Sequence, residues 1–129
     1  MSAERTSGCW PPHVAQPISL PGSRLVISRF VRGFTDAAYI RARVEEIGAR
    51  LCNHCYTSPL TVAASLHWLS TCRDAFLFED CVEDSPLRHE LTVEKVQSVD
   101  GWIAVPDRPG LGVTLDETFV RKYLVAESE

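Results

Sequence analysis

The chain has 129 residues, of which 45% are hydrophobic and 23% charged, so it has the length and composition of one globular domain and not of a disordered chain. Its formal net charge of −4 argues against nucleic acid as the main partner, because phosphate binding requires a basic surface. No apolar run approaches the roughly 20 residues that span a bilayer, and the first twenty residues lack the apolar core of a secretion signal. We therefore expect a cytoplasmic protein with no membrane partner.

The N-terminal part of the chain, residues 1–32, is expected to be an irregular arm. Residues 1–23 hold four prolines and show no sustained period of two or 3.6. Only residues 24–28, RLVIS, form an apolar run that could be a short strand.

A helix is predicted from about residue 35 to residue 50. Thr35 or Asp36 can cap its first turn, and four apolar residues recur at steps of three and four to line one face: Ala37, Ile40, Val44 and Ile47. Gly48 stands where a helix commonly stops.

A strand and a second helix are predicted next, over residues 51–53 and 59–71. Ser58 and Pro59 suit the cap and the first position of that helix. The helix is apolar on nearly all sides, so we expect it to be buried, with His67 and Trp68 as packing residues. Residues 75–78, AFLF, then read as a strand of a parallel sheet that is covered on both faces.

This alternation of strands and helices predicts an α/β fold. His54 and Glu79 stand just past the two strand ends, which is where βα barrels carry their chemistry. The tail differs: Asp100 and Gly101 signal a hairpin, Asp116 caps a last short helix, and residues 126–129 are expected to fray. Residues 88–90 read as a solvated charged loop.

Several segments, in one consistent order, resemble the mandelate racemase and muconate lactonizing enzyme group of the enolase superfamily. They are RGFTDAAYIRARVEEIGARLCNHCY, TVAASLHWL, FLFED, SPLRHEL and DGWIAVPDRPGLGVTLDE, and they cover about residues 33–125. The resemblance implies a partial (β/α) barrel of the last two or three βα units plus a C-terminal hairpin and short helix. Residues 50–53 would be the seventh strand and residues 75–78 the eighth.

The resemblance also implies a chemistry. Family members hold one Mg²⁺ on three acidic side chains at the ends of the third, fourth and fifth strands, and a base removes the proton next to a carboxylate. Those strands and the lysine-bearing second strand have no counterpart in this sequence, and such a barrel needs about 250 residues. Mg²⁺ is therefore expected in full-length relatives and not on this chain.

Two residues match functional positions of the family. His54 stands where one branch places a histidine acid/base catalyst, although the aspartate that orients that histidine is matched here by Ile27. Glu79 matches an acid that contacts the substrate, a small carboxylate such as a sugar acid; Asp80 is one residue away. The alternatives are a histidine that bonds locally and a solvated acidic strand end.

The five cysteines suggest a second kind of site. Cys52, His54 and Cys55 form C-N-H-C, which resembles part of a zinc site. A tetrahedral site needs a fourth ligand, however, and the odd cysteine count favours small buried thiols in a reducing compartment.

Two interpretations of function remain. The resemblance implies a fragment of a Mg²⁺-dependent lyase or isomerase, most like a sugar-acid dehydratase, which is expected to be inactive alone. Alternatively, it is a non-catalytic truncated or interaction protein, and exposed sheet edges would favour self-association.

Overall fold

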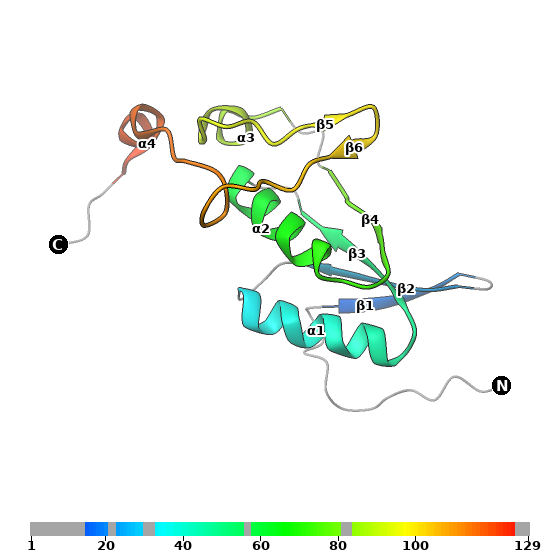
Figure 1. The fold of residues 1–129 in the computed structure, drawn as a ribbon. Coiled ribbons are helices and arrows are strands. Elements are labelled where there is room, and N and C mark those ends of the chain that lie inside the picture. The colour runs from blue at the N-terminus through cyan, green and yellow to red at the C-terminus, as the bar shows by residue number, and fades with distance from the viewer. Residues whose placement is uncertain (1–14, 21–22, 30–32, 56–57, 81–83, 126–129) are drawn as a thin grey trace.

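The computed structural model describes residues 15–20, 23–29, 33–55, 58–80 and 84–125. At its centre is a four-stranded sheet with the strand order β1-β2-β3-β4 (Figure 1). The strands β2, β3 and β4 are parallel, and β1 is antiparallel to β2. Their bounds are β1, Ala15–Leu20; β2, Ser23–Arg29; β3, Arg50–His54; and β4, Ala75–Leu77.

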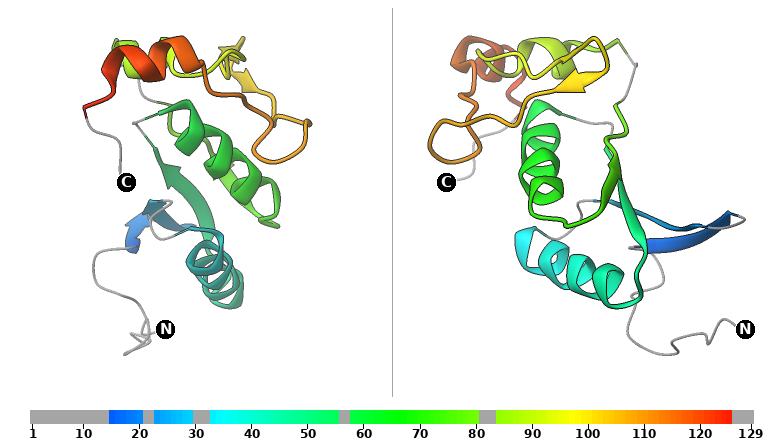
Figure 2. Two further views of the ribbon diagram at one scale, coloured as in Figure 1. Left: turned by 90° about the vertical axis from the view of Figure 1, so that its left-hand side faces the viewer. Right: turned by 45° about the vertical axis from the view of Figure 1, so that its right-hand side comes forward.

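Two helices connect the parallel strands and lie on the same face of the sheet. They are α1 (Phe34–Glu46), between β2 and β3, and α2 (Pro59–Ser70), between β3 and β4. Figure 2 shows both helices packed side by side against this face. The succession β2-α1-β3-α2-β4 confirms the predicted α/β class. None of the helices in the described segments has the length and hydropathy to cross a membrane.

The prediction of an irregular N-terminal arm was wrong for residues 15–20. This segment is β1, which pairs antiparallel with β2 from Ala15 opposite Ser28 to Leu20 opposite Ser23. Pro17 obscured the strand in the sequence, but a proline is tolerated in an edge strand because the outer edge needs no ladder hydrogen bond. The remaining residues of the arm, 1–14, 21–22 and 30–32, lie outside the described residues, as does the tail 126–129.

Helix α1 confirms the predicted apolar face but not the predicted cap. Ala37, Ile40 and Val44 are buried. The N-cap is Gly33, with a φ of 88°, and it has no side chain to make a cap hydrogen bond, so neither Thr35 nor Asp36 occupies the cap position. The positive φ explains why a glycine stands there. At the other end α1 stops at Glu46, about four residues before the predicted end, and Gly48 takes a φ of 61° in the turn that follows.

Helix α2 packs across α1 and confirms its predicted burial and capping. Ser58 Oγ accepts a hydrogen bond from the Thr61 amide. The indole of Trp68 is buried in the main apolar cluster, and its Nε1 donates to the Ala37 carbonyl over 2.8 Å. Because that contact joins the two helices, Trp68 fixes their relative position as well as filling the core. The His67 ring lies on a more exposed side, with Nε2 3.2 Å from the Leu111 carbonyl oxygen.

The prediction that residues 75–78 form a strand covered on both faces was wrong. β4 lies at the edge of the sheet, and its three residues are all exposed, including Phe76 at 39% and Leu77 at 58%. Only Phe78, just past the strand, packs against the apolar clusters. A continuous apolar run is typical of a strand that is covered on both faces. β4 instead lies at the edge of the sheet, and no described strand pairs with its outer side.

The C-terminal segment folds over the end of α2 (Figure 1). The predicted hairpin is confirmed, with positive φ at Asp100 and Gly101 as a type I′ turn requires. Asp116 Oδ1 accepts from the Thr118 and Phe119 amides, which confirms the predicted cap. The elements of this segment are α3, Pro86–Glu90; β5, Ser98–Val99; β6, Trp102–Ile103; and α4, Glu117–Tyr123.

Glu94 holds the loop before α4 in place. Its carboxylate accepts from the Thr114 amide over 2.6 Å and from the Thr114 hydroxyl over 3.2 Å, and it pairs with Arg108. Gly112, with a φ of 74°, lets the same loop close, since a Cβ there would lie 2.4 Å from Pro106 Cβ.

Replacing Trp68 with phenylalanine should destabilise the fold by about 2–3 kcal/mol, because it removes the bond to Ala37 and part of a buried ring. The free energy of unfolding in urea measures this loss. The matched control is Trp102→Phe at an indole that is 81% exposed, where we expect a change within about 0.5 kcal/mol. Equal effects at the two positions would contradict the packing role of Trp68.

Glu94 should make stability depend on pH. The hydrogen bond from the Thr114 amide, aided by the charge of Arg108, lowers the pKa of the Glu94 carboxyl. A lowered folded-state pKa stabilises the fold above the unfolded value of about 4.3, and this contribution is lost as the pH falls through the folded value. Glu94→Gln should therefore lower the melting temperature at pH 7, and the difference from wild type should vanish in acid. A difference that persists at the lowest pH would contradict this assignment.

Candidate functional site

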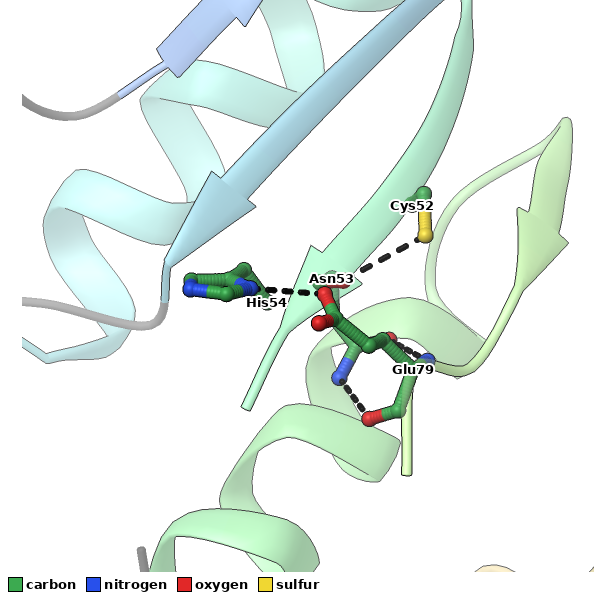
Figure 3. A network of polar contacts seen from close by, with 4 residues as sticks. All are labelled: Cys52, Asn53, His54 and Glu79. Carbon is green, nitrogen blue, oxygen red and sulfur yellow. Dashed lines mark hydrogen bonds and ion pairs between the residues drawn. The ribbon is translucent and has the colours of Figure 1, made fainter. Parts of the chain in front are cut away.

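The ends of β3 and β4 bring together the two residues that the sequence singled out. His54 is the last residue of β3, and Glu79 follows β4 by two residues. His54 Nδ1 lies 2.7 Å from Glu79 Oε2 (Figure 3). The two side chains remain 30% and 43% exposed, so a small molecule can reach them. A histidine and a carboxylate in contact at an accessible strand end can exchange a proton with a bound ligand.

The neighbouring residue, Asn53, makes two hydrogen bonds to the backbone of Glu79. Side chains alternate along a strand, so Asn53 points away from His54, and it is fully buried at 0% exposure. Its Oδ1 accepts from the Glu79 amide over 2.7 Å, and its Nδ2 donates to the Glu79 carbonyl over 3.3 Å. Figure 3 shows both bonds on one side of the Glu79 backbone. Sequence reasoning missed this residue; an asparagine inside an apolar strand was the available signal.

Cys52 lies on the same strand, and its thiol donates to the Asn53 carbonyl over 3.3 Å. Burial, and to a lesser extent the charge of Glu79, raises the pKa of this thiol. Burial also raises the pKa of Cys72 to about 11. Both are free thiols, and a raised pKa disfavours the thiolate form that a nucleophilic cysteine needs. Cys55 is buried against Val62 and Leu66, which confirms the interpretation of small packed residues for Cys52 and Cys55.

Residues 88–90 are not a solvated loop, as the sequence suggested, but belong to α3. Ser85 caps this helix, and Arg88 Nη2 donates to Asp80 Oδ1 over 2.6 Å. The Arg88 side chain is only 17% exposed. A serine followed by a proline was the overlooked helix signal, the same one that was used correctly for α2. Asp80 is thus paired with Arg88, whereas Glu79 contacts His54. The two neighbouring carboxylates therefore have different partners, and only Glu79 belongs to the predicted site.

A pocket of about 240 Å³ lies beside this ion pair. Its lining includes Asp80, Arg88, His89, Thr92 and Lys95, together with Pro59 at the start of α2. Neither His54 nor Glu79 lines it. Lys95 Nζ donates to the carbonyls of His89 and Thr92, so this lysine is engaged within the fold. The pocket is therefore separate from the His54–Glu79 contact, and the chemistry that the sequence predicted rests on that contact.

The described residues do not form a metal site. No group of three histidine, cysteine, aspartate or glutamate side chains in these segments comes close enough to share an ion. His54 and Glu79 give two donors that bond each other, and Cys81 lies outside the described residues. This donor set does not fit the three-carboxylate Mg²⁺ site that the resemblance implies.

A sheet of parallel strands joined by helices defines an α/β domain, and comparison with known proteins defines its family. Residues 28–119 match the family model described as enolase C-terminal domain-like. This chain belongs to that family. The matched region begins at residue 28, five residues before the predicted start of the family segment at residue 33 and inside the predicted arm.

Individual relatives agree with this assignment. D-galactonate dehydratases of Xanthomonas euvesicatoria and Xanthomonas axonopodis are each 30% identical to this chain over 96 residues, which cover 70% of the chain and 25% of those enzymes. A mandelate racemase/muconate lactonizing enzyme of Jannaschia is 26% identical, with a TM-score of 0.63 over 75% of this chain and 25% of that one. An enolase of the mandelate racemase subgroup from Agrobacterium tumefaciens shares the fold, with a TM-score of 0.65 at 21% identity over 76% and 27% of the two chains. The chain thus spans about a quarter of the length of these relatives.

Proposed function

We propose that the chain carries the last part of a proton-transfer site of a sugar-acid dehydratase and has no turnover of its own. The observation that carries this proposal is the contact of His54 with Glu79 at the ends of adjacent parallel strands. Support comes from the relatives, which include dehydratases of a sugar acid, D-galactonate. The expected location is the cytoplasm.

The roles of the two residues follow from their chemistry. A neutral imidazole nitrogen of His54 can take a proton from the carbon next to a carboxylate and return it to a departing hydroxyl, which leaves as water. Glu79 is the substrate contact: one of its oxygens lies against His54, and the second can accept from a sugar hydroxyl. In the full-length relatives Mg²⁺ would stabilise the charge that develops on the carboxylate.

We expect no turnover because the described residues lack a group of side chains that could bind a metal and so stabilise the anion formed by proton abstraction. Proton abstraction next to a carboxylate requires strong stabilisation of the resulting anion. The described residues offer no metal-binding group for that purpose, and the chain spans about a quarter of its relatives. We therefore expect it to bind a sugar acid weakly without converting it.

D-galactonate added to the ¹⁵N-labelled chain should shift the amide signals of His54 and Glu79, with a dissociation constant on the order of millimolar for so few contacts. D-galactose, which lacks the carboxylate, should not. With Mg²⁺ in D₂O, neither dehydration nor exchange of the α-proton is expected. His54→Gln should abolish the shifts, whereas His67→Gln, a control at a histidine away from the site, should leave them unchanged.

Two outcomes would overturn parts of this proposal. Turnover that disappears in His54→Gln would contradict the inactivity and retain the catalytic role of His54. Shifts that are identical in His54→Gln and wild type would contradict the site itself.

A second candidate is an interaction protein, favoured by the exposed β4 edge. Phe76 and Leu77 are exposed there, and edge strands offer unpaired backbone groups to another chain. The occupant we propose is a second copy. Antiparallel pairing centred on Phe76 would set Arg73 of one copy opposite Glu79 of the other, and this opposite-charge pairing favours self-pairing.

Self-association should be lost in Leu77→Lys, because a charge on an edge strand opposes pairing. Light scattering across a concentration series measures the mass. Leu87→Lys is the matched control, at an exposed leucine of α3 away from the sheet. A monomer at all concentrations of wild type, or an equal effect of the two substitutions, would exclude the β4 interface.

A further inference from the structure

We infer that Asn53 is a positioning residue that fixes Glu79 against His54, and that Glu79 thereby supplies the carboxylate that orients the His54 ring. This inference rests on the proposed role of His54. It assigns Glu79 a function in addition to substrate contact, and it gives Asn53 a function that neither the sequence nor the relatives indicated.

The need for such a residue arises because β4 is weakly held. The strand has three residues and lies at the sheet edge. It pairs with β3 only at Leu51–Ala75 and Cys52–Leu77, with an irregular register between these pairs. A backbone attached this loosely would leave the residues after it free to move. Glu79 would then reach His54 only part of the time.

Asn53 attaches the chain after β4 to β3 through the backbone of Glu79. Its amide bonds both the N–H and the carbonyl of Glu79, over 2.7 and 3.3 Å, which reproduces with one side chain the pair of bonds a strand would make. Because Asn53 is fully buried, its side chain is held by packing, and the Asn53 end of both bonds is removed from water. Glu79 therefore extends from a fixed backbone.

The direction of the proton on His54 follows from this contact. An ionised carboxylate only accepts hydrogen bonds, so the Nδ1 atom facing Glu79 Oε2 must carry the proton. In the neutral ring the unprotonated nitrogen is then Nε2. The contact thus selects the tautomer in which Nε2 is the basic atom.

Glu79 takes the place of an orienting group that the preceding strand does not provide. The position that the family resemblance assigns to an aspartate is Ile27, which pairs with Cys52 in the β2–β3 register. The carboxylate comes instead from the strand on the other side of β3. In a parallel sheet both neighbours of a strand end reach the same residue, so either can serve.

The tautomer of His54 tests this inference without turnover. Long-range ¹H–¹⁵N spectra of the chain with labelled histidine, at a pH of about 8.5 where an ordinary imidazole is neutral, should show His54 protonated at Nδ1. In Asn53→Leu, and in Glu79→Ala as the reference, the ratio of Nδ1–H to Nε2–H tautomer should fall by about tenfold, the factor that one charge-assisted hydrogen bond supplies. Ser65→Ala, which removes another buried polar group, should not change it.

If Asn53→Leu does not fold, amide hydrogen exchange in the wild type provides a second test of the inference. The Glu79 amide should be protected as strongly as the amides of β3, because Asn53 Oδ1 accepts from it. Exchange at the rate of an open chain, or an unchanged tautomer in folded Asn53→Leu, overturns the inference. Either result leaves galactonate binding at His54 intact, so failure here and failure of the proposed function are distinguishable.

Discussion

The structure depends on the pairing of β3 with a parallel strand on each side. This pairing places β3 in the middle of the sheet, where Leu51 and Asn53 are buried beneath α1 and α2. Parallel strands end at the same edge, so the residues that follow β3 and β4 must meet. The contact between His54 and Glu79 is a consequence of this topology, and the helices contribute by holding the strands in order.

The sequence predicted the parts of this arrangement that follow from local patterns. The face of α1, the cap of α2 and the Asp100–Gly101 turn each depend on a few neighbouring residues, and all three are as expected. The meeting of His54 and Glu79 could also be anticipated, because strand ends in a βα repeat converge. What a local pattern cannot show is which strand lies at an edge, and for that reason β1 was missed and the burial of β4 was overestimated.

Asn53 shows a different limit of sequence reasoning. Its side chain acts on a residue 26 positions away, and no spacing rule links the two. The sequence placed this asparagine only at the end of a predicted strand, within a C-N-H-C pattern. Its role becomes visible only when burial leaves both amide groups to be satisfied, because a buried amide must find partners and those available belong to Glu79. A related constraint favours the pairing of Arg88 with Asp80, because the Arg88 side chain is only 17% exposed.

The exposed edge of β4 and the proposed role of the His54–Glu79 contact place opposite demands on this strand. An edge strand open to a partner gains from freedom to adjust, whereas a carboxylate that orients an imidazole must be held within a few tenths of an ångström. Asn53 reconciles them by fixing the backbone at Glu79 while the three residues of β4 stay exposed. Any chain that pairs with this edge would thus add its strand beside an already positioned Glu79. The contact between His54 and Glu79 therefore forms whether or not a partner strand covers the edge of β4. Edge pairing and the proposed chemistry can occur in the same molecule.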